Sequence, residues 1–219
     1  MIRSLFTFLA LTALSLSAVC AGDYVPRRGD ILFQGAGDSE FSKSIAASTT
    51  ADTVEFRPIH VAFVVHGGSP QQAFVIEAEP KLGVCITPYE EFINGTTKNA
   101  NGRPMVLVKR ISSISSEESA KAAEKALKLL GLPYDWMFLP DNNAIYCSEL
   151  IQLSFCDKDN TFLFDHIPLN FKGPDGNILP FWQKIYDQRS MPVPQGERGT
   201  SPVSIMNSPL LTTVHTFWK

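Results

Sequence analysis

The fold is decided by two apolar segments joined by a turn, IHVAFVVHGGSPQQAFVIEA (residues 59–78). Residues 59–65 and 73–78 are rich in valine, isoleucine and phenylalanine, which favour β-strands. Between them, GGSP at 67–70 is typical of a turn. The pattern therefore predicts an antiparallel hairpin.

Two ionisable residues interrupt these apolar strands. If the turn has four residues, His66 lies opposite Gln71 and His60 lies directly opposite Glu77, on the same face of the sheet. A carboxylate in that position would fix the tautomer of the imidazole and stabilise its charged form. A pairing of Glu79 with either histidine is the rival arrangement, and a structural histidine or a carboxylate facing water are the simpler interpretations.

The rest of the chain alternates between short strands and helices. Further strands are expected at 30–34, 84–86 and 105–108, and helices at 39–49, 88–93, 117–130, 145–155 and 182–186. Residues 94–104 read as a loop and 190–202 as a linker-like stretch. This order predicts an α+β fold in which an antiparallel sheet packs against helices.

Cys147 lies where a polar loop (140–143) turns into a helix. The amino end of a helix carries a partial positive charge and free N–H groups, which favour a thiolate and can bind an oxyanion. Cys147, Leu150 and Ile151 share one helix face, so the thiol should point toward the sheet. Cys156 lies about half a turn out of phase with Cys147. The alternative is that Cys147 is a small buried apolar residue.

The amino terminus is typical of a secretory signal peptide. Arg3 precedes a mainly apolar stretch (5–19), and cleavage after Ala21 would fit the small residues that follow. We therefore expect a signal peptide at 1–21, a single mature domain at 22–219, and a periplasmic or cell-envelope location. The rival interpretation is a lipoprotein acylated at Cys20, and only then would the protein be attached to a membrane.

Composition excludes several classes of function. The net charge is −3 and no run of lysine or arginine suggests nucleic-acid binding. The pair Lys109-Arg110 reads as a solvated strand end. After cleavage, Cys85, Cys147 and Cys156 remain, without a C-x-x-C pair, so we expect no metal and no organic cofactor.

Taken in order, several short motifs resemble the permuted papain-like amidases of the NlpC-type superfamily, the YiiX-like group. They are GDILFQ (29–34), HVA (60–62), VIEA (75–78), LGLPYD (130–135) and YCSE (146–149). Along this chain the histidine comes first, the acid second and the cysteine third, and the permuted branch of the superfamily has the same order. The resemblance also extends to residues 201–202 and 210–214, so it covers nearly all of the mature chain. It implies a circularly permuted papain-like fold.

The resemblance also implies the site. It makes Cys147 the nucleophile, His60 the base and Glu77 the acid, with Tyr146 in an oxyanion-hole or positioning role. The chain departs from the family at Arg57-Pro58, where polar or small residues are more usual, and this affects the expected shape of the substrate entrance.

The expected function is that of an exported cysteine hydrolase that cleaves an amide bond, of peptide or peptidoglycan type, through a thioester. Its substrate would be a peptide, an amino-acid amide or an acyl lipid. One alternative is a lipid acyltransferase, phospholipase or thioesterase, whose acyl pocket would use late apolar residues: Phe162, Phe164, Ile167, Phe171, Phe181 and Trp182. The other alternative is a non-catalytic binding module.

Overall fold

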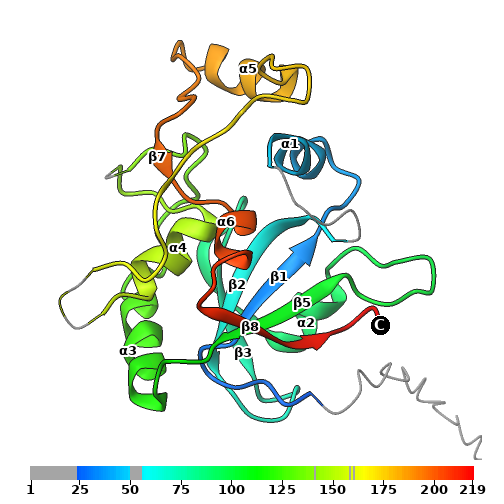
Figure 1. Ribbon diagram of the computed structural model, residues 1–219, viewed down its shortest axis with the longest axis vertical. Helices are drawn as coiled ribbons and strands as arrows, with labels where there is room; N and C mark the ends of the chain where they lie inside the picture. The colour runs from blue at the N-terminus through cyan, green and yellow to red at the C-terminus, as the bar shows by residue number, and fades with distance from the viewer. Residues whose placement is uncertain (1–23, 50–55, 141, 158, 160) are drawn as a thin grey trace, which may run out of the picture.

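A six-stranded antiparallel sheet forms the centre of the computed structural model (Figure 1). Its strands are β1 (Ile31–Gly35), β2 (Pro58–His66), β3 (Phe74–Glu79), β4 (Gly83–Pro88), β5 (Val106–Ile111) and β8 (Leu211–Thr216). They lie in the order β4-β3-β2-β1-β5-β8, and every neighbouring pair is antiparallel. The structure describes residues 24–49, 56–140, 142–157, 159 and 161–219, so the predicted signal peptide at 1–21 lies outside the described residues.

Helices pack on both faces of this sheet, which confirms the α+β prediction. They are α1 (Glu40–Ser48), α2 (Tyr89–Asn94), α3 (Ser116–Leu127), α4 (Cys147–Ser154), α5 (Pro180–Asp187) and α6 (Pro202–Met206). A small ribbon of β6 (Ile167–Pro168) and β7 (Arg198–Gly199) lies apart from the main sheet. None of the helices in the described part of the chain has both the length and the apolar character needed to cross a bilayer.

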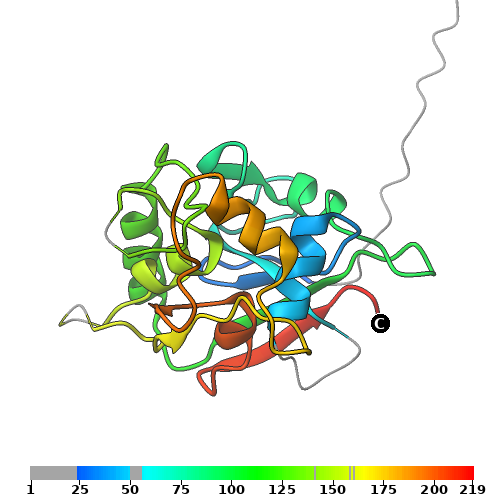
Figure 2. The same ribbon diagram turned by 90° about the horizontal axis from the view of Figure 1, so that it is seen from above.

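Alternate side chains of β2 enter two different apolar cores. Val61 and Phe63 pack in the core that includes α3, α4 and α6, whereas Ala62 and Val64 pack in the core that includes α2. A third, smaller core joins α1 to α5, which lie side by side in both views (Figure 1, Figure 2). Strand β2 is therefore buried on both faces, which explains its nearly continuous apolar sequence.

The register of the hairpin differs from the prediction. Phe63 lies opposite Ile76 and Val64 opposite Val75, so His60 is not directly opposite Glu77. The register differs for two reasons. The turn continues to residue 73, so more than four residues connect the strands. In addition, the pairing of β2 with β3 is irregular between Val64 and His66. The difference is two residues, and because side chains alternate with a period of two, His60 and Glu77 keep the same face.

The carboxyl-terminal region contains more regular structure than the sequence predicted. The expected linker at 190–202 includes β7 and the first residue of α6, and β8 pairs with β5 at one edge of the sheet. These elements were not predicted because each is too short to show a periodic pattern of apolar residues in the sequence.

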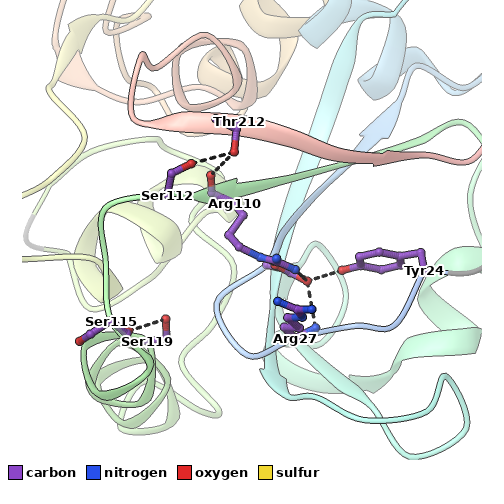
Figure 3. Close-up of polar contacts among 8 residues, drawn as sticks. Tyr24, Arg27, Arg110, Ser112, Ser115, Ser119 and Thr212 are labelled. Atoms are coloured by element: carbon purple, nitrogen blue, oxygen red, sulfur yellow. Dashed lines mark hydrogen bonds and ion pairs between the residues drawn. The ribbon is translucent and has the colours of Figure 1, made fainter.

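Asp30 is fully buried immediately before β1 and joins several segments of the chain. Its carboxylate accepts hydrogen bonds from Arg110 Nε (2.5 Å) and Nη2 (2.9 Å), from the backbone N–H of Arg27 (2.9 Å) and from the hydroxyl of Tyr24 (Figure 3). Lys109 Nζ donates to the carbonyl of Met206 (2.5 Å). The expectation that Lys109 and Arg110 form a solvated strand end is therefore wrong.

Replacing Arg110→Met should lower the free energy of unfolding by about 3 kcal/mol, because it leaves a buried carboxylate without its cation. Urea denaturation measures this loss. The matched control is Lys121→Met, which breaks an exposed pair with Glu117 and should change the stability far less. Equal losses for the two variants would contradict the anchoring role of Arg110.

Candidate active site

Helix α4 begins at Cys147 because the chain changes from extended to helical conformation at Tyr146. Tyr146 has φ −99° and ψ 165°, and its backbone N–H donates to the side chain of Glu149 (3.4 Å). Just before it, Ile145 forms a bridge with Tyr134, which fixes the approach to the helix. Cys147 therefore occupies the first helical position, where backbone N–H groups have no intrahelical partner.

The helix face that carries Cys147 packs against the sheet, as the sequence predicted. Leu150 and Ile151 are fully buried on this face, and the rings of Phe155 and Phe63 lie 5.0 Å apart. Cys147 itself is only 4% exposed. The packing thus directs the thiol toward the sheet rather than toward solvent.

His60 lies near the start of β2 and contacts both other predicted site residues. Its Nε2 lies 2.7 Å from a carboxylate oxygen of Glu77, and Cys147 lies close enough to the ring to raise the pKa of His60. Because Nε2 faces the carboxylate, Nδ1 is the ring nitrogen left for the thiol. The ring of Phe92 packs nearby, with centroids 6.0 Å apart. The structure thus brings His60, Glu77 and Cys147 together.

Glu77 is held by a second partner. Its other carboxylate oxygen accepts a hydrogen bond from the hydroxyl of Thr87 on β4 (2.5 Å). The rival acid, Glu79, is occupied elsewhere, since its carboxylate accepts the backbone N–H groups of Lys81 (2.8 Å) and Leu82 (2.9 Å). The pairing of His60 with Glu77 is therefore the one that the structure contains.

The charges of this group depend on one another. Burial lowers the pKa of His60, but the hydrogen bonds to Cys147 and Glu77 and the charges of both outweigh burial and raise the pKa to about 10. Burial raises the pKa of Glu77, but the hydrogen bond and charge of His60, with the hydroxyl of Thr87, lower it below its ordinary value. At neutral pH the pair is an imidazolium beside a carboxylate.

Tyr146, predicted to help position the site, is buried and bonded away from the thiol. Its hydroxyl accepts a hydrogen bond from the backbone N–H of Thr200 (3.0 Å), and burial raises its pKa above the ordinary value. This contact ties the segment between β7 and α6 to the start of α4. The arrangement favours a positioning role over direct contact with an oxyanion.

A cavity of about 50 Å³ lies beside Cys147. Its walls come from segments far apart in sequence, and they consist of Ile45, Ser48, Thr49, Ile59, Tyr134, Phe138, Tyr146, Cys147, Ser148, Leu169, Asn170, Phe171, Trp182, Thr200, Ser201 and Pro202.

Only part of the predicted apolar set takes part in this cavity. Phe171 and Trp182 line it, whereas Phe162, Phe164 and Ile167 line a different pocket beside His166 and Arg198. Sequence analysis missed Phe138, Ser148 and Thr200, because nothing in the local pattern shows that these residues meet.

The pKa of His60 can be measured by NMR titration of its ring protons, and we expect it well above 6.5. Glu77→Gln removes the negative charge but keeps the shape, so it should lower this pKa toward the ordinary value. The matched control, Glu79→Gln, should leave the titration of His60 unchanged. An unchanged titration in Glu77→Gln would show that the carboxylate does not support the imidazolium.

The same shift makes folding stability depend on pH. Because the pKa of folded His60 is about 10, against 6.5 ordinarily, its protonation stabilises the folded state fully below pH 6.5. This contribution is lost as the pH rises through 10. Unfolding free energies measured across this range should fall less steeply in Glu77→Gln than in the unmodified chain.

With the geometry described, similarity to known proteins gives the family. A family model described as "Permuted papain-like amidase enzyme, YaeF/YiiX, C92 family" matches residues 25–215. The uncharacterized protein YiiX of Escherichia coli (strain K12) is 28% identical over 204 residues, which is 93% of each chain. The crystal structure of yiiX from Escherichia coli O157:H7 has a TM-score of 0.71 and 26% identity, covering 90% of this chain and 100% of that one.

The yiiX of that crystal structure is described as a metalloprotein. In the described ranges of this chain, no three histidine, cysteine, aspartate or glutamate side chains gather in a way that would hold a metal ion. Glu77 instead hydrogen-bonds to His60 and Thr87, and Cys147 lies close to the ring of His60. By sequence and by fold, this chain belongs to the permuted papain-like amidase family.

Proposed function

We propose that this chain is an exported cysteine hydrolase that cleaves an amide bond with Cys147 as nucleophile, His60 as base and Glu77 as orienting acid. The observation that carries the proposal is that His60 hydrogen-bonds to Glu77 and also lies close to Cys147. Membership of an amidase family supports the same reaction class.

The proposed reaction starts from the imidazolium form of His60, whose second ring proton comes from the thiol of Cys147. The sulfur of Cys147 then attacks the substrate carbonyl, and the negative oxygen is stabilised by N–H groups at the amino end of α4, including that of Cys147 itself. His60 returns its proton to the leaving amine as the carbon–nitrogen bond breaks, which leaves a thioester. Water, deprotonated by His60, attacks the thioester and releases a carboxylic acid and the thiol.

The proposed substrate is a peptide, an amino-acid amide or a peptidoglycan-type amide of the cell envelope. A second candidate is an acyl lipid, and one observation favours it: most of the cavity beside Cys147 is lined by apolar and aromatic side chains, including Phe138, Phe171 and Trp182. The two candidates share the thioester and differ in the acyl group that it carries.

Iodoacetamide should alkylate Cys147 at neutral pH faster than Cys85 or Cys156, because an adjacent imidazolium favours the thiolate. Burial and the charge of Glu77 raise the pKa of Cys85, which makes it a slow internal reference. His60→Ala should slow alkylation of Cys147 by about 100-fold, whereas His66→Ala, at the exposed end of the same strand, should not. Peptide mass spectrometry gives the three rates.

If Cys147 reacts no faster than an ordinary free thiol, the proposed enzyme is wrong. If it does react, Cys147→Ser incubated with cell-envelope extract should retain an acyl group as a serine ester. The mass of that group separates the two candidate substrates.

We also propose export, on the basis of the signal peptide predicted at 1–21. Expression of the full chain should yield a mature protein beginning at Gly22, with an intact mass that corresponds to residues 22–219. A mature form beginning at Cys20 with an added lipid would favour the lipoprotein instead, and an uncleaved chain would contradict both.

A further inference from the structure

The hydroxyl of Thr87 reaches the candidate site from β4, an edge strand of the sheet. Glu77 lies directly opposite Cys85, so Thr87, two residues farther along β4, faces the same side of the sheet and lies diagonally across from Glu77. Its hydroxyl donates at 2.5 Å to the carboxylate oxygen of Glu77 that does not bond to His60. The carboxylate on β3 is thus held at both oxygens, by one residue from each neighbouring strand.

The chain around Thr87 holds this side chain in place. Pro88 follows Thr87, and the residue before a proline is restricted to extended backbone conformations. Helix α2 comes next, and its Phe92 packs near the ring of His60, with centroids 6.0 Å apart. One short stretch of chain therefore contacts both Glu77 and His60.

The carboxylate of Glu77 needs a second donor because it is buried. Only 6% of Glu77 is exposed, and burial favours its neutral form. A carboxylate accepts hydrogen bonds and donates none, so each of its buried oxygens requires a donor. In the part of the chain that the structure describes, His60 provides one donor and Thr87 the other. Without the hydroxyl, one oxygen of the charged form would lose its partner.

The hydroxyl also affects where the proton lies between Glu77 and His60. Their side chains are 2.7 Å apart, and the pair can exist as imidazolium with carboxylate or as imidazole with carboxylic acid. Hydrogen bonds to a carboxylate are stronger than hydrogen bonds to a neutral carboxyl group, so the hydroxyl of Thr87 stabilises the charged pair more than the neutral pair. The contact therefore favours the charged form of His60, which in turn favours a thiolate at Cys147.

We propose that Thr87 is a positioning residue of this site, whose hydroxyl turns one oxygen of Glu77 toward His60 and keeps the negative charge on Glu77. Thr87 does not line the cavity beside Cys147, so it acts through Glu77 rather than on the substrate. The inference rests on the proposed function, because it assigns a fourth residue to the same reaction.

Two substitutions separate the hydroxyl of Thr87 from its methyl group. Thr87→Val keeps the shape and removes the hydroxyl, whereas Thr87→Ser keeps the hydroxyl and removes the methyl group. In Thr87→Val, carbon-13 NMR titration should show a raised pKa for the Glu77 carboxyl group. Its proton affinity should rise about tenfold, as for the loss of one hydrogen bond to a charged group. In Thr87→Ser the same group should titrate as in the unmodified chain.

The matched control is Thr216→Val, on β8 at the opposite edge of the sheet. Thr216 is half-buried like Thr87, and the same exchange of hydroxyl for methyl there should leave the titration of Glu77 unchanged. Circular dichroism melting confirms that the variants are folded.

Alkylation of Cys147 by iodoacetamide connects the titration to the nucleophile. Thr87→Val should slow alkylation at neutral pH by about threefold to tenfold, because a proton shifted toward Glu77 leaves His60 less often charged. Thr87→Ser and Thr216→Val should react at the rate of the unmodified chain.

Three outcomes would overturn the positioning role while Cys147 of the unmodified chain reacts rapidly. One is a Glu77 carboxyl group that titrates in Thr87→Val as it does in the unmodified chain. Another is an equal change in Thr87→Ser, which would assign the effect to packing of the methyl group. The third is an alkylation rate that Thr87→Val leaves unchanged. Slow alkylation of the unmodified chain would instead refute the proposed function, and the positioning role with it.

Discussion

The packing of α4 against β2 is the constraint on which the site depends. Leu150 and Ile151 are fully buried on the face of α4 that packs against the sheet, and the contact of Phe155 with Phe63 fixes the carboxyl end of the helix. Since successive helical residues differ by about 100° around the axis, this packing leaves one orientation for Cys147. Apolar side chains that touch no substrate therefore set the position of the thiol relative to His60.

Two buried ion pairs serve the sheet in different ways. Asp30 and Arg110 join the start of β1 to β5, and β1 in turn pairs with β2, so the pair secures the strand that carries His60. The pair of His60 and Glu77 lies on β2 and β3 and controls the charge of the imidazole. The pair of Asp30 and Arg110 holds the strands in place, and the pair of His60 and Glu77 sets the protonation state of the imidazole.

The sequence predicted the faces of the central hairpin but not its register. Strand alternation has a period of two, so the two-residue error left His60 and Glu77 on one face, and the predicted contact is present. Turn length and the irregularity before His66 determine the register, and neither has a clear local pattern. The helix phase of Cys147 was predictable for the same periodic reason.

Features that depend on distant segments were not predictable. The partner of Arg110 is 80 positions earlier in the chain, so a strand-end arginine carried no sign of its buried carboxylate. The cavity combines α1, α4, α5 and the segment before α6, and only the folded chain shows which of their residues meet. Strand β8 lies at a sheet edge, and its mainly exposed side chains gave no apolar alternation.

The hydrogen bond between Tyr146 and Thr200 has a consequence for the order in which the site is assembled. During synthesis His60 and Glu77 emerge first, Cys147 follows, and the segment that contains Thr200 comes last. A chain that ends before Thr200 has all three candidate catalytic residues but lacks one wall of the cavity and the group that binds the hydroxyl of Tyr146. The nucleophile is thus made well before its surroundings are complete, and a complete cavity exists only in a finished chain.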